Sequence, residues 1–236
     1  MARLHALVIG VSHYPHSTDP VLASIAGPAI SAARFADWLR TSWNHPGVAL
    51  GSLEVLLSPM EDDEAATADA AAGKVAGPAD AKHVGLEVYE WAERCNVSTE
   101  DIALLYVAGH GTESLYGGGF LLLEDYDAPG SGALGNALDL DHVRKAIGTK
   151  CAHADFIFVD ACRFTTDEQF DVADASALKP IKWNREDATL RTHLKVFYGA
   201  APDQEFLHPA RVDRARARDD VLQGAYGGPR RRRRRP

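Results

Sequence analysis

The chain has 236 residues, 46% of them hydrophobic and 25% charged, with a formal net charge of -8 at pH 7, which predicts one medium globular domain with a sizeable core. The negative balance argues against a general polyanion-binding protein, and no apolar run reaches the roughly 18 residues of a membrane span. Three cysteines are too few and too scattered for a disulfide framework, so we expect a reducing, cytoplasmic compartment.

Residues 6–11 are apolar at every position, which is typical of a strand buried on both faces of a parallel sheet. A Pro-rich loop follows over residues 12–28. Gly27-Pro28 at its end is expected to open a helix, because proline is favoured at an early helical position. The apolar residues of this helix recur at three- and four-residue spacing and predict a buried stripe. The stripe consists of Phe35, Trp38, Leu39 and Trp43.

The next segments continue the alternation of strands and helices. A second strand is expected over residues 53–57, and the acidic, Ala- and Gly-rich residues 61–81 predict a loose loop. A second helix is predicted over residues 80–95. Its apolar face is Val84, Val88, Trp91 and Cys95. A third buried strand over residues 102–108 ends in Gly109-His110-Gly111.

Further along, residues 117–123 predict a hairpin strand and residues 140–147 a third helix. A fourth strand over residues 156–159 ends in Asp160-Ala161-Cys162-Arg163, and a fifth covers residues 196–198. Strands that alternate with amphipathic helices indicate an α/β fold, with a mostly parallel central sheet and helices on both faces.

The end of the chain has a different composition. Residues 205–236 are Arg-rich and lack apolar periodicity, so we expect a folded domain over residues 1–204 followed by a disordered segment. Arg230 to Arg235 form an unbroken basic run, without which the formal charge would be -14 (-8 - 6). The run is either a solvated tail or a contact for nucleic acid or an anionic membrane. Apart from this tail, no nucleic-acid binding is expected.

Two of the predicted strands end on reactive side chains, His110 and Cys162. Ligands of open α/β sheets bind beyond the carboxyl ends of the strands, so both residues are expected to face one crevice. A thiol attacks a carbonyl well only as thiolate, and a nearby imidazole favours that state. The backbone amides of Gly111 and Cys162 are the candidate donors of an oxyanion hole. The arrangement requires no cofactor and no metal.

The residues around these two side chains resemble known motifs. The segment Val107-Ala108-Gly109-His110-Gly111 is similar to the histidine motif of caspases and metacaspases, and Val159-Asp160-Ala161-Cys162-Arg163 to their cysteine motif. The separation of 52 residues agrees with the roughly 50 residues between the two motifs in caspases. The first strand and helix, Gly119–Leu122 and Asp127-Ala128 also resemble this family, so that the likeness covers residues 4–204.

This resemblance, to metacaspases and prokaryotic caspase-like proteins in particular, implies a caspase-like three-layer sandwich and a cysteine endopeptidase with a Cys162–His110 dyad. Asp160 stands two residues before the cysteine, as in metacaspases. An acid in the first specificity pocket suits a substrate with Arg or Lys at the cleavage point. Asp19 is a weaker candidate for a second acid of the pocket. A protein or peptide with a basic cleavage residue is therefore the expected partner, and residues 211–218 and the basic run are candidate self-cleavage sites.

Other interpretations of the same residues are open. Cys162 could be a buried structural thiol, and the domain a catalytically silent adaptor that acts through protein–protein interaction. Asp160 could simply cap backbone amides. Cys151 and His153 are close in sequence but lack two further zinc ligands. The acidic residues Glu124, Asp125 and Asp127 lack the ligand order of a calcium loop, which favours a solvated turn.

Overall fold

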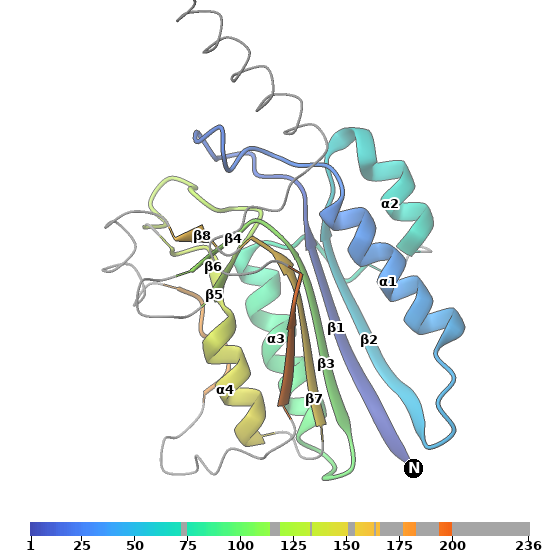
Figure 1. Cartoon of the computed structure of the whole chain (residues 1–236). Coiled ribbons are helices and arrows are strands. Elements are labelled where there is room, and N and C mark those ends of the chain that lie inside the picture. Colours follow the sequence, from blue (N-terminus) through green and yellow to red (C-terminus); the bar gives the residue numbers. More distant parts are fainter. Residues whose placement is uncertain are drawn as a thin grey trace, which may run out of the picture. The chain divides into compact units, whose positions relative to one another are not determined.

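A five-stranded parallel sheet forms the centre of the protein (Figure 1). The computed structural model describes residues 1–71, 75–113, 119–132, 134–150, 154–162, 164–165, 177–182 and 194–199. The sheet has the strand order β2-β1-β3-β7-β9, and every neighbouring pair is parallel. Its strands are β1 (Ala2–Val11), β2 (Val48–Ser58), β3 (Ile102–Gly109), β7 (Ala154–Ala161) and β9 (Leu194–Tyr198). The five predicted strands are all confirmed, each longer than its apolar run.

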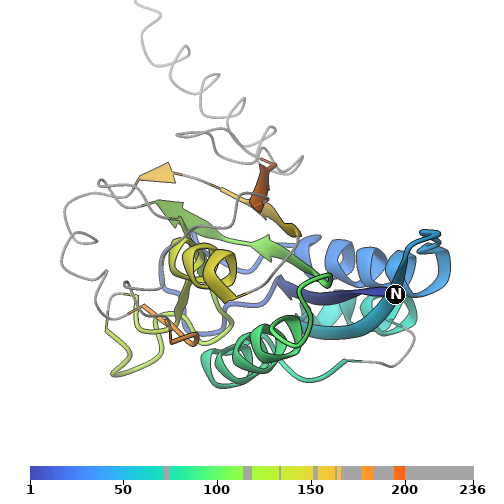
Figure 2. The ribbon, with the colours of Figure 1, turned by 90° about the horizontal axis from the view of Figure 1, so that it is seen from below.

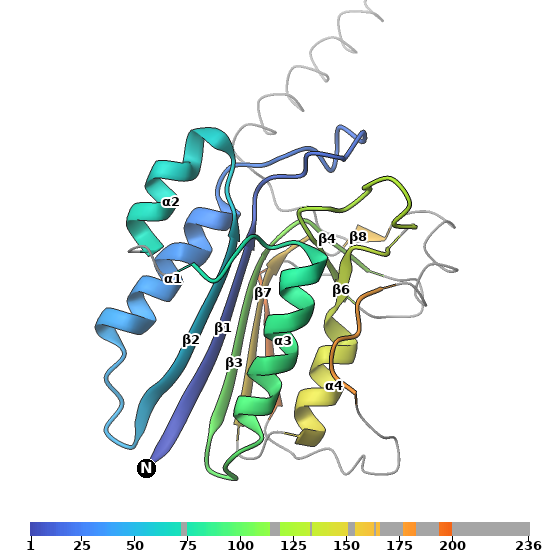
Figure 3. The ribbon, with the colours of Figure 1, turned by 180° about the vertical axis from the view of Figure 1, so that it is seen from behind.

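Helices cover both faces of this sheet, which confirms the predicted three-layer sandwich (Figures 1 and 2). On one face lies α1 (Pro28–Ser42), with α2 (Glu64–Ala71) packed beside it. On the other face lie α3 (Ala81–Cys95) and α4 (Leu140–Lys150), seen from behind in Figure 3. Alternate residues of β1 enter the two apolar clusters, one on each side of the sheet.

The helix α3 is the one whose apolar face the sequence predicts best. Its four predicted face residues are all buried: Val84, Val88, Trp91 and Cys95. The side chain of Asp80 caps the helix by accepting the backbone N–H of His83 at 2.8 Å. Because this helix packs against β1, β2 and β3, it supports the strand that ends just before His110.

The helix α1 packs differently from the predicted stripe. Its buried residues are four alanines and Leu39, while Trp38 is 47% exposed. The reason is a close approach to β1 at Gly10, where a Cβ atom would lie 2.6 Å from the Cβ of Ala32. Large side chains have no room in this contact, so alanines form it and the aromatic residues lie at its border. The prediction that Trp38 belongs to the buried stripe is therefore wrong.

The predicted loose loop over residues 61–81 is also partly wrong. A 3₁₀ turn covers Glu61–Asp63, and α2 follows directly. Alanine has the highest helix propensity, and acidic residues stand both in the 3₁₀ turn and, as Glu64, in the first turn of α2. Both features favour a short helix here.

A second, four-stranded sheet extends the first beyond its carboxyl edge. Its order is β6-β5-β4-β8, and its strands are β4 (Gly111–Glu113), β5 (Gly119–Leu122), β6 (Ala137–Asp139) and β8 (Phe164–Thr165). Only β5 is predicted from the sequence. The strand β4 continues the chain from β3, and β8 continues it from β7, so both lead away from the central sheet at neighbouring points (Figure 1).

Two further observations complete the description. In the part of the chain that the structure describes, no helix has the length and apolar character needed to cross a bilayer. The predicted boundary at residue 204, the Arg-rich segment 205–236, Cys151 and His153 all lie outside the described residues.

Candidate active site

The strands β3 and β7 end next to each other, and the segments that follow them, β4 and β8, pair in the same register. The pairs on either side of this point are Gly109–Ala161 in the first sheet and Thr112–Phe164 in the second. Both pairs are 52 residues apart in the sequence (161 − 109 and 164 − 112). His110 and Cys162 have the same separation and are each one residue past the end of their strand. The two predicted residues therefore lie side by side on adjacent segments of the chain.

His110 is buried, with 4% of its surface exposed, and has contacts to the loop between β1 and α1. Its Nε2 atom lies 2.9 Å from the carbonyl oxygen of Ala23. Its backbone N–H donates to the hydroxyl oxygen of Tyr14 at 2.8 Å, and the ring of Tyr14 lies 4.8 Å from the imidazole, centroid to centroid. One loop thus fixes both the main chain and the ring of His110.

The contact with Ala23 also determines which ring nitrogen carries a hydrogen. A carbonyl oxygen can only accept a hydrogen bond, so Nε2 is the donor. In the neutral imidazole this makes Nδ1 the acceptor nitrogen. Nδ1 is therefore the nitrogen of His110 that can accept a proton.

Cys162 is partly exposed and forms no disulfide, whereas Cys95, the other described cysteine, is buried. Gly111 packs directly against its backbone. A Cβ atom on Gly111 would lie 2.5 Å from the carbonyl oxygen of Cys162 and 2.9 Å from the Cβ of Ala161. Only glycine fits here without a backbone shift, so the main chain of Gly111 is next to the cysteine.

Asp160 lies at the end of β7, partly buried on the face of the sheet that α1 covers. The hydroxyl of Tyr106, on β3, donates to its Oδ2 atom at 3.2 Å. Burial raises the pKa of Tyr106, and the neighbouring carboxylate of Asp160 raises it further, so this phenol remains a donor. Near the Oδ1 atom lies Gly199, where a Cβ atom would approach to 3.0 Å. Among the described residues, no cationic side chain pairs with Asp160.

Asp19 is exposed in the loop after β1, where its Oδ1 atom accepts the backbone N–H of Val21 at 2.8 Å. It lies near Tyr126, whose pKa is raised by burial and then by the charges of Asp127 and Asp19. The structure therefore places Asp19 beside the loop that follows β5. Its predicted contribution to the specificity pocket remains a prediction.

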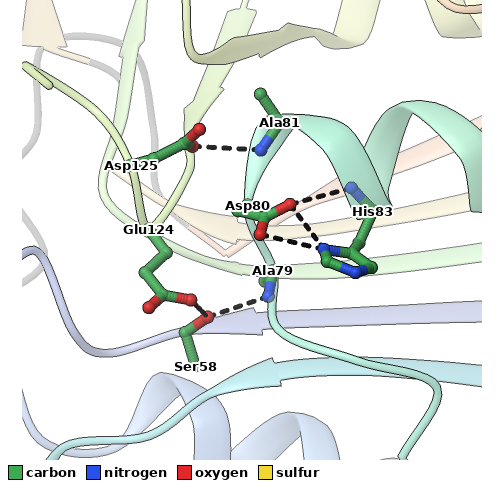
Figure 4. A network of polar contacts seen from close by, with 7 residues as sticks. All are labelled: Ser58, Ala79, Asp80, Ala81, His83, Glu124 and Asp125. Atoms are coloured by element: carbon green, nitrogen blue, oxygen red, sulfur yellow. Dashed lines mark hydrogen bonds and ion pairs between the residues drawn. The ribbon is translucent and has the colours of Figure 1, made fainter.

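The acidic residues after β5 accept hydrogen bonds from other parts of the chain (Figure 4). Glu124 accepts the hydroxyl of Ser58 at 2.5 Å, and the same hydroxyl oxygen accepts the backbone N–H of Ala79 at 2.8 Å. Asp125 accepts the backbone N–H of Ala81 at 3.0 Å. These bonds join the end of β2 and the start of α3 to the loop after β5. Within the described ranges, no three His, Cys, Asp or Glu side chains are grouped to bind a metal ion.

Four residues with contacts to the site are absent from the sequence predictions: Tyr14, Ala23, Tyr106 and Gly199. Ala23 acts through its backbone carbonyl, for which a side-chain pattern gives no signal. Tyr106 lies within an apolar strand, where tyrosine is common. Its register partner is Phe158, and Asp160 is the diagonal neighbour two residues further along the paired strand. A hydroxyl at such a diagonal position is the one signal that indicates this contact, since diagonal neighbours lie within reach of an aromatic side chain.

Compared with known protein families, residues 3–210 match the family model described as the caspase domain. No curated protein matches the sequence at a significant level.

Proposed function

The chain belongs to the caspase domain family of peptidases, and we propose that it is a cysteine endopeptidase with Cys162 as nucleophile and His110 as general base and acid. The observation that carries this proposal is that the strand register places the two residues side by side on adjacent segments of the chain. The fixed donor role of Nε2 on His110 supports it, because that contact leaves Nδ1 as the proton acceptor.

The proposed reaction follows from this arrangement. His110 takes the proton of the Cys162 thiol, and the thiolate attacks the carbonyl carbon of the scissile peptide. The carbonyl oxygen becomes negatively charged, and the backbone N–H groups of Gly111 and Cys162 stabilise it. His110 then gives its proton to the leaving amine, which departs as the C–N bond breaks. Water, deprotonated by His110, attacks the thioester and releases the acid and the thiol.

We further propose that Asp160 binds an Arg or Lys side chain of the substrate, as in metacaspase-like members. A partly buried carboxylate without a cationic partner among the described residues favours a cation from elsewhere. Tyr106 donates to the Oδ2 atom of Asp160. Gly199, the residue near the Oδ1 atom, has no side chain that would fill the space there. A guanidinium or ammonium group would find a charge-assisted bond there.

The Arg-rich segment is a candidate substrate in its own right. Residues 211–218 and the run from Arg230 to Arg235 supply cleavage points for a pocket that prefers a basic residue. Self-cleavage would then remove part of residues 205–236, and mass spectrometry of the purified protein would detect it. The three scattered cysteines favour the cytoplasm as the place where this reaction occurs.

The experiment that tests the proposal compares two fluorogenic peptides, one with Arg and one with Asp at the cleavage point. Wild type is expected to hydrolyse the Arg peptide, and Cys162→Ala to lose that activity. Hydrolysis of the Asp peptide instead would retain the peptidase and refute the role of Asp160. If neither peptide is cleaved and Cys162 reacts with alkylating agents no faster than an ordinary thiol, the protein is an adaptor rather than an enzyme.

A further inference from the structure

The loop between β1 and α1 contacts His110 through two different residues, and these two contacts have different targets. The carbonyl of Ala23 accepts from the ring, and the hydroxyl of Tyr14 accepts from the backbone N–H. The loop itself is closed by internal bonds, since Tyr14 donates its backbone N–H to the hydroxyl of Ser24 at 2.9 Å. Ser24 directly follows Ala23, so this bond links the two residues that contact His110.

The hydroxyl of Tyr14 lies where three chain segments meet. Its hydrogen is shared between the carbonyl oxygens of Val11 at 3.3 Å and Leu122 at 3.4 Å, at the ends of β1 and β5. Its oxygen accepts from His110, one residue after β3. The backbone of Gly109, just before His110, approaches it closely, because a Cβ atom there would lie 2.8 Å from this hydroxyl. One buried atom therefore ties three strand ends together beside the site.

The chemistry of this phenol suits a permanent contact. Tyr14 is 3% exposed, and burial is the main reason why its pKa is raised, while the bond from His110 lowers it and the nearby Cys162 raises it again. The phenol consequently keeps its hydrogen over the whole range in which a cysteine peptidase works. Its hydroxyl can donate to the strand ends and accept from His110 at the same time.

We propose that Tyr14 is a positioning residue of the dyad, which fixes the main chain of His110 so that Ala23 can orient its ring towards Cys162. This inference rests on the proposed function, since it assigns Tyr14 a task within that reaction. Loss of the hydroxyl would leave the backbone N–H of His110 without its acceptor, and the histidine would shift. A shift of the ring weakens the bond to Ala23, which is strongest when the imidazole is charged.

The test measures the rate at which iodoacetamide alkylates Cys162 at pH 7, with the product located by mass spectrometry, in wild type, Tyr14→Phe, His110→Ala and the matched control Tyr89→Phe. Tyr89 is 46% exposed on α3. In wild type His110 assists the loss of the thiol proton, so Cys162 is expected to react much faster than in His110→Ala. Tyr14→Phe is expected to lose part of the rate that His110→Ala loses, and Tyr89→Phe to keep the wild-type rate.

The same variants are then compared in peptide hydrolysis. Tyr14 touches no substrate, so Tyr14→Phe should lower kcat by roughly 10- to 100-fold, as small misplacements of catalytic groups do, and leave KM unchanged. Equal alkylation rates in wild type and His110→Ala would refute the dyad and, with it, this role. A faster wild-type rate that Tyr14→Phe fully retains would refute the role of Tyr14 alone.

Because the Tyr14 hydroxyl is buried, thermal unfolding of each variant accompanies these measurements. If Tyr14→Phe does not fold, Ser24→Ala replaces it, since Ser24 is only partly buried and joins the two contacts on His110. Ser24→Ala is expected to lower the alkylation rate of Cys162 by a smaller amount. A rate identical to wild type in a folded Ser24→Ala protein would overturn the inference.

Discussion

His110 and Cys162 lie side by side because the two chain segments that carry them stay in one register from the first sheet into the second. Adjacent strands lie roughly 4.8 Å apart, so this spacing sets the distance between the two main chains at the site. The relative position of the two residues is therefore a property of the central sheet, and the loop between β1 and α1 holds the main chain and the ring of His110 in that position.

Removal of the imidazole should abolish catalysis without loss of the fold. His110→Ala is expected to lower kcat for the Arg peptide by at least about 10³-fold, as loss of one member of a catalytic unit does. The matched control is His45→Ala, because His45 is an exposed histidine near the opposite end of the strands. The role of His110 would be refuted by a folded His110→Ala protein that retains a tenth of the wild-type rate.

Neutralisation of Asp160 should weaken the binding of basic substrates in particular. A charge-assisted hydrogen bond contributes about 1.5–3 kcal/mol, so Asp160→Asn is expected to lower kcat/KM for the Arg peptide roughly 10- to 100-fold, mainly through KM. Steady-state kinetics with Arg and neutral peptides measure this selectivity. Asp141→Asn, which changes an acid paired with Arg144 on α4, serves as the control. Equal losses on both peptides would argue against a pocket role.

A methyl group at Gly10 should disrupt the contact between β1 and α1. The new Cβ would lie 2.6 Å from the Cβ of Ala32 and 2.9 Å from the Cα of Ala29, so the helix must move. Overpacking of this kind costs about 1–3 kcal/mol, which urea unfolding can measure. The control Gly47→Ala has its nearest neighbour atom at 3.8 Å and should change stability by less than about 1 kcal/mol. Equal stabilities of the two variants would contradict the close contact.

The carboxyl of Asp125 predicts a specific pH dependence. Burial is the first cause of its raised pKa, and the charges of Asp80 and Glu124 add to it against the bond from Ala81. An acid whose pKa is higher in the folded state destabilises that state above this pKa and has no effect below its unfolded value, about 3.9. Asp125→Asn keeps an acceptor oxygen for Ala81 and loses the charge.

The variant should therefore equal wild type in stability near pH 4 and become relatively more stable as the pH rises through the raised pKa of Asp125. Thermal unfolding from pH 4 to pH 7 measures this difference. Asp127→Asn, which changes an exposed acid in the same loop, should show a smaller change. A constant difference between Asp125→Asn and wild type at all pH values would show that burial of the charge has no energetic effect here.

The central sheet and the helices α1, α3 and α4 follow from the sequence because long apolar runs and helical periodicity are strong signals, whereas the short, alanine-rich α2 is not predicted. The short strands of the second sheet are not predicted, since β4, β6 and β8 have two or three residues each, too few for any period to appear. Trp38 shows another limit. The sequence pattern marks large apolar residues as core, but the space between helix and strand decides which of them fit.

The candidate site divides in the same way. His110 and Cys162 could be predicted because each stands at the end of a buried strand. Their supporting contacts could not, because Ala23 acts through a carbonyl and Tyr14 through a hydroxyl placed by the path of a loop. Such contacts depend on the tertiary structure, which assembles residues that are distant in the sequence.

The strand order has a consequence for the synthesis of the protein on the ribosome. The three strands that pair first, β2, β1 and β3, are complete once about 110 residues have been made, and they carry His110 at their edge. Cys162 follows 52 residues later, which at 5–20 residues per second is roughly 3 to 10 s. Its strand then adds to an existing edge. Cys162 thus reaches His110 only after half of the domain has had time to form around the histidine.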